Sequence, residues 1–310
     1  MLGKNLEVTM IDNLASPLCF AGNKTRILSL IHQHLPEDYD LFVDVFGGSG
    51  VVGLSQDKKL VYNEKDKYVF NLNRTIKETD LDHILFQIQF LIDTYSLSKD
   101  NKQSYLKLRE DFNSLFCHCL HDRNLITRRQ SNLALLTLVF YSFNHYITFN
   151  KDGKFTTPAG THRSSYNKSL ENKLITFKNR INSFEYNLEM CNMDFRDLYE
   201  YVARLYDYHL EGKLFFFDPP YLVSNDSYSR TYGNSWNEKD EEDLYKMCDL
   251  INKNGGKFIL TNMLQKGDVI NEKLLLFSKK YNTFDTNVSF KNCSYQHKKL
   301  PDKELLIKNY

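Results

Sequence analysis

Short apolar runs and longer helical periods alternate along this chain. Five runs have the length and apolar content of strands, and they lie at 41–46, 60–64, 214–217, 257–262 and 302–310. Helices are expected at 66–76 and 238–254, beside these runs. A run of four consecutive apolar residues, as at 214–217, is typical of a strand buried on both faces. Strands that alternate with helices predict an α/β fold built on an open sheet.

Residues 77–183 interrupt this alternation. The stretches 84–95 and 133–147 are long helical periods, and the region shows no strand-turn-strand pattern. We therefore expect a mainly α-helical insert at 77–183. The α/β domain that carries it is formed by 1–76 and 184–310.

One stretch of the insert, 143–160, has the pattern of a hairpin. The segment from Asn150 to Lys154 is a strong β-turn sequence flanked by aromatic residues. From 151 to 180 the chain carries seven Lys or Arg against two acidic residues. Basic tips suit contact with phosphates, while Asn and Thr side chains can read base edges. A basic surface hairpin of no further function fits the same residues, because a basic cluster alone is a weak nucleic-acid signal.

A carboxylate, two prolines and an aromatic ring follow the run at 214–217. Asp218 stands at the carboxyl end of a strand, where open α/β sheets place their ligands. Pro219 and Pro220 cannot continue a hydrogen-bonded ladder, so they stiffen the chain as it leaves the sheet. A carboxylate that accepts from an exocyclic amine, beside the flat ring of Tyr221, suits chemistry on an amino group. An ordinary Pro-Pro turn is the alternative interpretation.

Two earlier strands end in residues suited to a nucleotide-like ligand. The glycines of Gly47-Gly48-Ser49-Gly50 let the backbone approach a ligand closely. Glu64 can accept hydrogen bonds from both hydroxyls of a ribose, and Asp44 is a candidate partner for an ammonium group. A lone glycine loop is weak evidence, and an acid after a strand is often only a solvated turn.

Composition adds limits rather than a function. The chain is 42% hydrophobic and 25% charged, which is ordinary for a soluble globular protein. Its formal net charge of +1 gives no overall attraction to nucleic acid, so a DNA-binding face must be local. The six cysteines form no CxxC pair, so we expect reduced thiols and no metal. Because no signal peptide or bilayer-spanning run is evident, we expect a cytoplasmic protein that binds no membrane.

Taken in order, these motifs resemble those of the Dam-like (D12 class, alpha group) adenine-N6 DNA methyltransferases over nearly the whole chain. The matches are Phe20-x-Gly22-Asn23-Lys24 to motif X, Phe46-x-Gly48-x-Gly50 to motif I, Asn63-Glu64 to motif II, Asp194-Phe195 to motif III and Asp218-Pro219-Pro220-Tyr221 to motif IV. Motif X departs from the family pattern, with Phe for the usual Trp and Asn for the second Gly. Asp194 fits a helix N-cap equally well on local grounds.

The resemblance implies a Rossmann-like S-adenosylmethionine-dependent methyltransferase sheet of seven strands, with the insert as target-recognition domain. The implied catalytic residues are Asp218, Pro219, Pro220 and Tyr221. The implied cofactor-binding residues are Phe20, Gly22, Lys24, Asp44, Phe46, Gly48, Gly50, Glu64, Asp194, Phe195 and Asp218. The cofactor implied is S-adenosyl-L-methionine.

The stretch 143–160 resembles the family pattern Phe-Asn-x-x-x-Arg-Phe-Asn-x-x-Gly-x-Phe-Asn-Val-Pro-x-Gly at eight positions. The DNA-binding residues expected are Lys24, Asn144, Thr148, Asn150, Lys151, Lys154, Thr156, Pro158 and Arg163. Thr148 stands in place of an Arg that commonly reads guanine through two hydrogen bonds. We therefore predict a target site other than GATC.

The activity implied is methylation of the N6 amine of an adenine flipped out of double-stranded DNA. Asp218 and the Pro219 carbonyl would accept from the amine, and Tyr221 or an aromatic residue of the following segment would stack on the base. The candidates in that segment are Tyr228, Tyr232 and Trp236. The setting would be a restriction-modification system with a separate cognate endonuclease, or phage or bacterial DNA modification.

Four alternatives stay open on the sequence alone. Cytosine-N4 methyltransferases usually carry Ser in place of Asp218, whereas RNA adenine and protein glutamine methyltransferases more often carry Asn. A DNA-binding homologue that has lost activity should have a damaged cofactor site, but the cofactor motifs here are intact. Transfer of label from the cofactor to DNA, RNA or protein distinguishes these functions.

Overall fold

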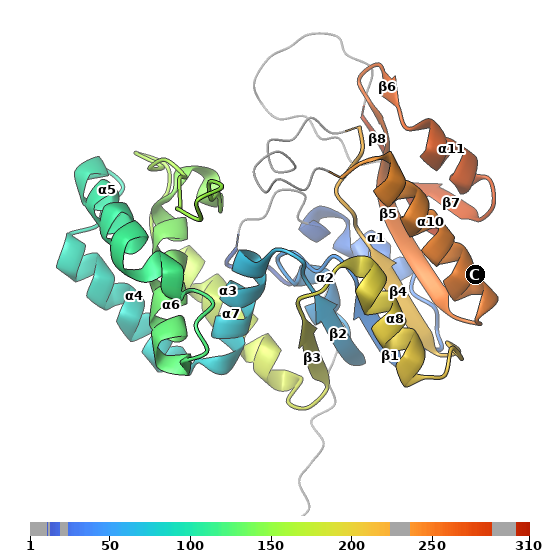
Figure 1. The fold of residues 1–310 in the computed structure, drawn as a ribbon, viewed down its shortest axis with the longest axis horizontal. Coiled ribbons are helices and arrows are strands. Elements are labelled where there is room, and N and C mark those ends of the chain that lie inside the picture. The colour runs from blue at the N-terminus through green and yellow to red at the C-terminus, as the bar shows by residue number, and fades with distance from the viewer. Residues whose placement is uncertain (1–10, 12, 19–23, 224–235, 287–301) are drawn as a thin grey trace, which may run out of the picture.

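The computed structural model describes residues 11, 13–18, 24–223, 236–286 and 302–310. Phe20, Gly22, Tyr228 and Tyr232, which the sequence analysis singled out, lie outside these residues. Within the described residues, the chain forms a sheet lobe and a helical lobe that stand side by side (Figure 1).

The sheet is mixed, and its strands follow the order β3-β2-β1-β4-β5-β8-β7, with β6 paired to β5. The strands are β1 (Leu41–Asp44), β2 (Lys59–Asn63), β3 (Leu188–Cys191), β4 (Lys213–Phe217), β5 (Lys257–Lys266), β6 (Val269–Ile270), β7 (Asn282–Asp285) and β8 (Lys303–Lys308). The first five strands in this order are parallel, and β8 is antiparallel to both neighbours. The predicted Rossmann-like α/β fold is confirmed.

Helices cover both faces of the sheet. They are α1 (Leu28–Gln33), α2 (Val51–Leu54) and α3 (Lys67–Glu78) on one side, and α8 (Phe195–Leu205), α10 (Glu238–Lys253) and α11 (Glu272–Ser278) on the other. The central strand β4 has apolar side chains on both faces, so both faces need to be covered. Phe216 packs into the core with the first group, whereas Phe215 and Phe217 pack into the core with the second. All three side chains are buried, as the predicted doubly covered strand requires.

The helical lobe lies between β2 and β3 in the sequence. Its elements are α4 (Leu81–Tyr95), α5 (Lys102–Asp111), α6 (Leu125–Tyr141) and α7 (Lys168–Ser183), with short turns at η2 (Phe112–Phe116), η3 (Cys117–Cys119) and η4 (Phe143–His145). Every residue of α6 from Ser131 to Tyr141 is buried, so α6 is the centre of this lobe. Arg180 of α7 donates hydrogen bonds to the carbonyls of Leu54 and Gln56, which ties α7 to the sheet lobe.

Between η4 and α7 the chain doubles back on itself. Phe149 bridges to Phe155, and the amide of Gly153 donates to the carbonyl of Asn150 across the turn. Gly153 has a φ of 76°, a left-handed conformation that glycine adopts without strain. The ring of Phe149 stacks on Tyr68 of α3 at 3.6 Å between centroids. This stack joins the hairpin-like segment to the sheet lobe.

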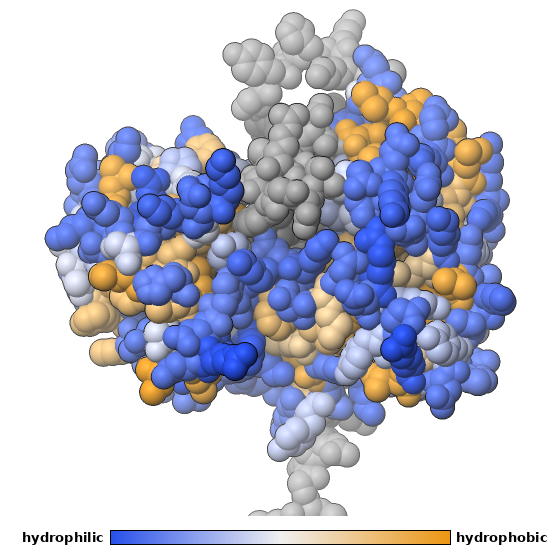
Figure 2. Space-filling model, viewed as in Figure 1, coloured by the Kyte–Doolittle hydropathy of each residue, from blue (hydrophilic) through white to orange (hydrophobic). Residues whose placement is uncertain are grey.

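The face shown in Figure 2 is mainly hydrophilic, with smaller hydrophobic areas on both lobes. Among the helices that the structure describes, none has both the length and the apolar character that a membrane span requires.

Candidate active site

Three neighbouring parallel strands bring their acidic residues to one edge of the sheet. Asp44 ends β1 and pairs in register with Phe216 of β4, so Asp218 follows only two residues beyond that level. Glu64 directly follows β2, the other neighbour of β1. Parallel strands end at a common edge, which in open α/β sheets is where ligands bind. The structure thus brings together the acids that the sequence analysis selected from three separate segments.

Asp218 is held by three donors. Nζ of Lys24, in the short turn η1 (Lys24–Ile27), lies 2.7 Å from Oδ2 of Asp218. Its other oxygen, Oδ1, accepts from the hydroxyls of Thr261 and Tyr221, each at 3.1 Å. Burial raises the pKa of Asp218, the charge of Lys24 works against this rise, and the negative charge of Glu304 adds to it.

Tyr221 turns its hydroxyl toward the same cluster. That hydroxyl accepts from Nζ of Lys24 at 2.9 Å and lies in hydrogen-bond contact with both Asp218 and Glu304. Nζ of Lys24 also lies 5.2 Å from the centre of the Tyr221 ring. Burial and the two carboxylates hold the pKa of Tyr221 well above its usual value, so the hydroxyl keeps its proton.

Glu304 of β8 completes the cluster, and the sequence analysis gave it no role. Its side chain is buried, with Oε1 3.6 Å from Nζ of Lys24 and Oε2 accepting from the hydroxyl of Thr286 at 3.2 Å. The local signal was an acid at the start of a terminal apolar strand, which does not by itself assign a role. Thr261, on β5, was likewise missed because a threonine within a buried strand carries no distinctive pattern.

The two prolines set the exit of the chain from β4. Pro219 is buried and Pro220 is exposed, so the chain turns outward within two residues of Asp218. Neither residue can donate to a neighbouring strand, and the sheet ladder therefore ends at this point.

The glycine loop lies beside Glu64. Oε2 of Glu64 accepts from the amide of Gly48 at 2.8 Å, and Oε1 accepts from the amide of Asp66 at 2.7 Å. Burial raises the pKa of Glu64 to about 8, with a further contribution from the charge of Asp66. A Cβ atom at Gly47 would stand 2.3 Å from the ring of Tyr62, so only glycine fits at this position.

Asp44 faces the same loop from β1. Its Oδ2 accepts from the amide of Gly53 at 2.9 Å, and burial raises its pKa to about 7. The hydrogen bond to Gly53 anchors the start of the chain segment that follows the glycine loop. The expected contact between Asp44 and an ammonium group stays a prediction.

Asp194 is the N-cap of α8, as its local sequence allowed. Its side chain accepts from the amide of Arg196 and pairs with Nζ of Lys65 at 2.8 Å. Burial alone would raise the pKa of Asp194, but hydrogen bonds from Lys65 and Arg196 outweigh it and lower the pKa. Oδ1 of Asp194 caps the helix and Oδ2 pairs with Lys65. The expected contact between Asp194 and a cofactor stays a prediction.

Three aromatic rings from separate motifs pack together. The centre of the Trp236 ring lies 5.7 Å from that of Phe46 and 5.5 Å from that of Phe195. Nε1 of Trp236 donates to the buried carboxylate of Glu241 at 2.5 Å, which fixes the indole against the two phenylalanines. Trp236, selected from the sequence as one of several rings for the target base, thus packs on two residues selected for the cofactor.

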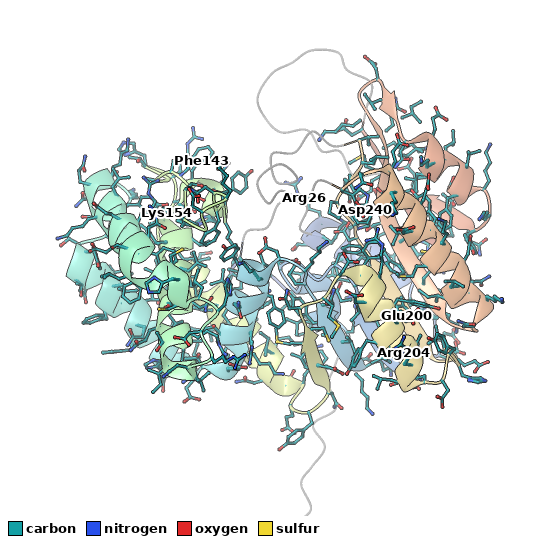
Figure 3. All side chains as sticks on the ribbon, in the orientation of Figure 1. Arg26, Phe143, Lys154, Glu200, Arg204 and Asp240 are labelled. Atoms are coloured by element: carbon teal, nitrogen blue, oxygen red, sulfur yellow. The ribbon has the colours of Figure 1, made fainter. Side chains whose placement is uncertain are left out.

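The expected DNA-binding residues differ in exposure. The exposed group consists of Asn144, Asn150, Lys151, Lys154, Thr156, Pro158 and Arg163. Thr148 is half-buried, and its hydroxyl forms a hydrogen bond with that of Thr157 at 2.6 Å. Lys24 is buried and paired with Asp218, so it is an element of the acidic cluster. Phe143 and Lys154 lie at the upper end of the helical lobe in Figure 3, and Arg26 lies on the sheet lobe across from them.

The residues at this edge suit S-adenosylmethionine. Gly48 and Gly50 have φ values of 50° and 80°, so the loop adopts a conformation that side chains would disfavour. Glu64 offers a carboxylate to paired hydroxyls, and the rings of Phe46, Phe195 and Trp236 offer an apolar surface to a purine. A glycine loop, an acid on the next strand and an Asp-Pro-Pro-Tyr segment on the strand beside them define the class of S-adenosylmethionine-dependent methyltransferases.

Comparison with known proteins identifies the family. The chain belongs to the D12 class N6 adenine-specific DNA methyltransferases, whose family model matches residues 20–298. It is 30% identical to the type II methyltransferase M.FokI of Planomicrobium okeanokoites over 96% of this chain and 43% of that protein. It is 28% identical to the modification methylase LlaI of Lactococcus lactis over 99% of this chain and 44% of that protein.

A third relative is matched over nearly its whole length. The type II methyltransferase M.MjaIII of Methanocaldococcus jannaschii is 27% identical over 94% of this chain and 98% of that protein. The chain therefore spans less than half the length of M.FokI and LlaI but nearly the whole of M.MjaIII.

Proposed function

We propose that this protein methylates the N6 amine of an adenine flipped out of double-stranded DNA, with S-adenosyl-L-methionine as methyl donor. The observation that carries the proposal is the position of Asp218 and Tyr221. Both stand at the carboxyl end of β4, beside the strand that ends in the glycine loop. Family membership and the names of the methylases to which the chain is similar support the same activity.

The cofactor would bind at the ends of β1 and β2. Glu64 would accept from its ribose hydroxyls, the glycine loop would face its methionine part, and Phe46, Phe195 and Trp236 would pack on its adenine. Phe20, Gly22 and Asp194 are further expected contacts. Bound S-adenosylmethionine supplies a methyl group on a positively charged sulfur, which the amine nitrogen takes as the carbon–sulfur bond breaks and a proton leaves the nitrogen.

The protein's own contribution is to orient the amine. The side chain of Asp218 and the carbonyl of Pro219 would each accept one N–H of the target, which directs the nitrogen lone pair away from both and toward the donor. Asp218 accepts from Lys24 and Tyr221 in this structure, so the amine would compete with these donors for its oxygens. The ring of Tyr221 would then stack on the flipped base. No covalent enzyme intermediate is required for this reaction.

DNA would bind across the exposed residues of the hairpin-like segment. Lys151, Lys154 and Arg163 would contact phosphates, which fixes the register of the protein on the duplex. Asn144, Asn150 and Thr156 would contact base edges. Since Thr148 stands where the family pattern that this stretch resembles has an arginine, we propose a target site other than GATC.

The natural setting that we propose is a restriction-modification system with a separate endonuclease for the same site. The modification methylases among its relatives support this setting. A cytoplasmic location follows from that role, because the genome that the enzyme protects lies there.

Transfer of tritium from labelled cofactor tests the proposed activity. We expect label in the N6-methyladenine of unmethylated double-stranded DNA and background levels in RNA and protein. Asp218→Ala should lower the single-turnover rate by at least about 10²-fold. Asp197→Ala, on the exposed face of α8, is the matched control and should change the rate by less than about twofold. Label in RNA, in protein or in cytosine, with DNA adenine unlabelled, would contradict the proposal.

A further inference from the structure

Four side chains from three distant segments form one charged cluster at the proposed catalytic edge. Lys24 comes from η1, Asp218 and Tyr221 follow β4, and Glu304 lies on β8. The cluster contains two carboxylates and one ammonium group, with the Tyr221 hydroxyl between them. Buried charges need partners, so each donor in the cluster is shared between the two acids.

The backbone of Glu304 is held within the sheet, whereas that of Asp218 is not. Its strand pairs with β5 on one side and β7 on the other, with Glu304 opposite Met263. The hydroxyl of Thr286 donates to Oε2 of Glu304, and the amide of Thr286 donates to its carbonyl at 3.1 Å. Oε1 is thereby directed at Tyr221 and Lys24. Asp218, in contrast, lies in the turn beyond the end of β4.

A donor that leaves Asp218 when the target amine binds needs a second acceptor nearby. Oδ2 of Asp218 pairs with Nζ of Lys24, and Oδ1 accepts hydrogen bonds from the hydroxyls of Tyr221 and Thr261. An incoming amine competes with Lys24 and Tyr221 for these oxygens, which have about four acceptor sites between them. A buried donor that loses its acceptor destabilises the state that contains it, and the effect is larger if the donor is charged. Glu304 already contacts Tyr221 and stands 3.6 Å from Lys24, so either donor can turn to it.

We propose that Glu304 is a positioning residue for methyl transfer: it accepts the hydrogen bonds of Tyr221 and Lys24 when the target amine takes their place at Asp218. This inference rests on the proposed function. Without the carboxylate of Glu304, Lys24 stays on Asp218 and competes with the amine. Tyr221, the ring expected to stack on the base, loses one of the three side chains that contact its hydroxyl.

The direct test is Glu304→Gln, which keeps the shape of the side chain and removes its charge. We expect the single-turnover rate of methyl transfer to fall about 10- to 100-fold, as for the loss of a group that orients reactants. The dissociation constant of labelled cofactor should change by less than about twofold. The matched control is Glu189→Gln on β3, where another strand glutamate accepts from a tyrosine, Tyr201, at the far edge of the sheet.

The pH profile separates positioning from a general loss of stability. The charge of Glu304 raises the pKa of Asp218. Its removal should therefore move the acidic limb of the rate profile to lower pH, while the rate on the plateau falls. A variant that was only less stable would lose activity without moving this limb. Glu189→Gln should change neither quantity.

A double-mutant cycle tests the route through Tyr221. Tyr221→Phe keeps the ring and removes the hydroxyl, so Glu304→Gln should cost less in that background than in the wild type. If Glu304→Gln lowers the rate by the same factor in the Tyr221→Phe variant as in the wild type, the proposal is contradicted. If Glu304→Gln does not fold, Thr286→Val replaces it, because Thr286 orients Glu304. A loss of roughly three- to tenfold is then expected, and an unchanged rate contradicts the proposal.

Two failures can be told apart. If the wild-type protein labels no DNA, the proposed function fails and this inference falls with it. If the wild type labels DNA and Glu304→Gln does so at the same rate, only the role of Glu304 is lost.

Discussion

The ammonium group of Lys24 lies 2.7 Å from Oδ2 of Asp218, and both side chains are largely shielded from solvent. The pair joins the N-terminal part of the sheet lobe to the turn after β4. It means that the carboxylate expected to receive a substrate amine is already neutralised by a cation of the protein. An ion pair shielded in this way is weak evidence for stability, because desolvation offsets much of the attraction. The ion pair matters for the chemistry of Asp218, because the charge of Lys24 lowers the pKa of that carboxyl.

Lys24→Gln should change the pH dependence of methyl transfer. Lys24 lowers the pKa of Asp218, so its removal lets that pKa rise under the influence of burial and Glu304. Since Asp218 must be ionised to accept from the amine, the acidic limb of the rate profile should move to higher pH. The ratio of variant to wild-type rate should therefore fall as the pH is lowered through the acidic limb of the wild-type profile.

Lys213→Gln is the matched control for that change. Lys213 pairs with Asp40 at 2.8 Å at the opposite end of the same strand, β4. Its removal should leave the position of the acidic limb unchanged. Superimposable normalised profiles for Lys24→Gln and the wild type would show that Lys24 does not tune Asp218.

The affinity for S-adenosylmethionine should depend on the ionisation of Glu64. Burial raises the pKa of this carboxyl to about 8, so at pH 7 most cofactor-free molecules carry it protonated. Ribose hydroxyls donate better to the carboxylate, because hydrogen bonds to charged groups are the stronger ones. The dissociation constant should therefore fall as the pH rises from about 7 to about 9, as equilibrium dialysis with labelled cofactor can measure.

Cofactor binding by Glu64→Gln is the comparison for the wild type. This variant should bind cofactor roughly 10- to 100-fold more weakly at pH 9, in line with the loss of charge-assisted hydrogen bonds. Its dissociation constant should change less than that of the wild type between about pH 7 and pH 9; the change that is left reports Asp44, whose pKa burial raises to about 7, and the amino group of the cofactor. Equal pH dependence in the variant and the wild type would mean that Glu64 does not contact the cofactor through its carboxylate.

Much of this architecture could be predicted because the signals are local. A four-residue apolar run followed by Asp218, and glycines after a strand that contains Asp44, each identify one strand end within a short window. Parallel strands then bring those ends together without any further information. The N-cap at Asp194 could also be predicted, because capping depends on one side chain and the next two amides.

Glu304 could not be predicted in the same way. The terminal strand is evident from its apolar residues, but its place between β5 and β7 depends on pairing between segments far apart in the chain. Only that placement directs Glu304 at Tyr221. The contact of Lys24 with Asp218 has the same origin: the turn is local, whereas its partner belongs to another part of the chain. The role of Lys24 as a DNA contact was inferred from motif position, and burial of the side chain now argues for its role at Asp218.

Trp236 should report cofactor binding by fluorescence. It is the single tryptophan of the chain and packs on Phe46 and Phe195, both expected at the cofactor site. Entry of an adenine ring beside these residues changes the surroundings of the indole, so its emission should shift or be quenched in proportion to occupancy. Titration with S-adenosylmethionine, followed in parallel by labelled binding, gives the measurement. Trp236→Phe should abolish the signal, and unchanged emission at saturation would place the cofactor away from this cluster.

Lys154→Gln should weaken DNA binding without changing the preferred sequence. Lys154 is exposed beside the Asn150–Gly153 turn, at the end of the helical lobe where Phe143 also lies (Figure 3). A lysine on a phosphate acts by releasing a counterion, so its loss should reduce the slope of log affinity against log salt by about one. The loss of affinity should be similar for all sequences tested. Lys239→Gln, on the exposed start of α10, should leave the slope as in the wild type. An equal slope for Lys154→Gln and the wild type, measured by fluorescence anisotropy from about 50 to 200 mM salt, would remove this lysine from the DNA-binding face.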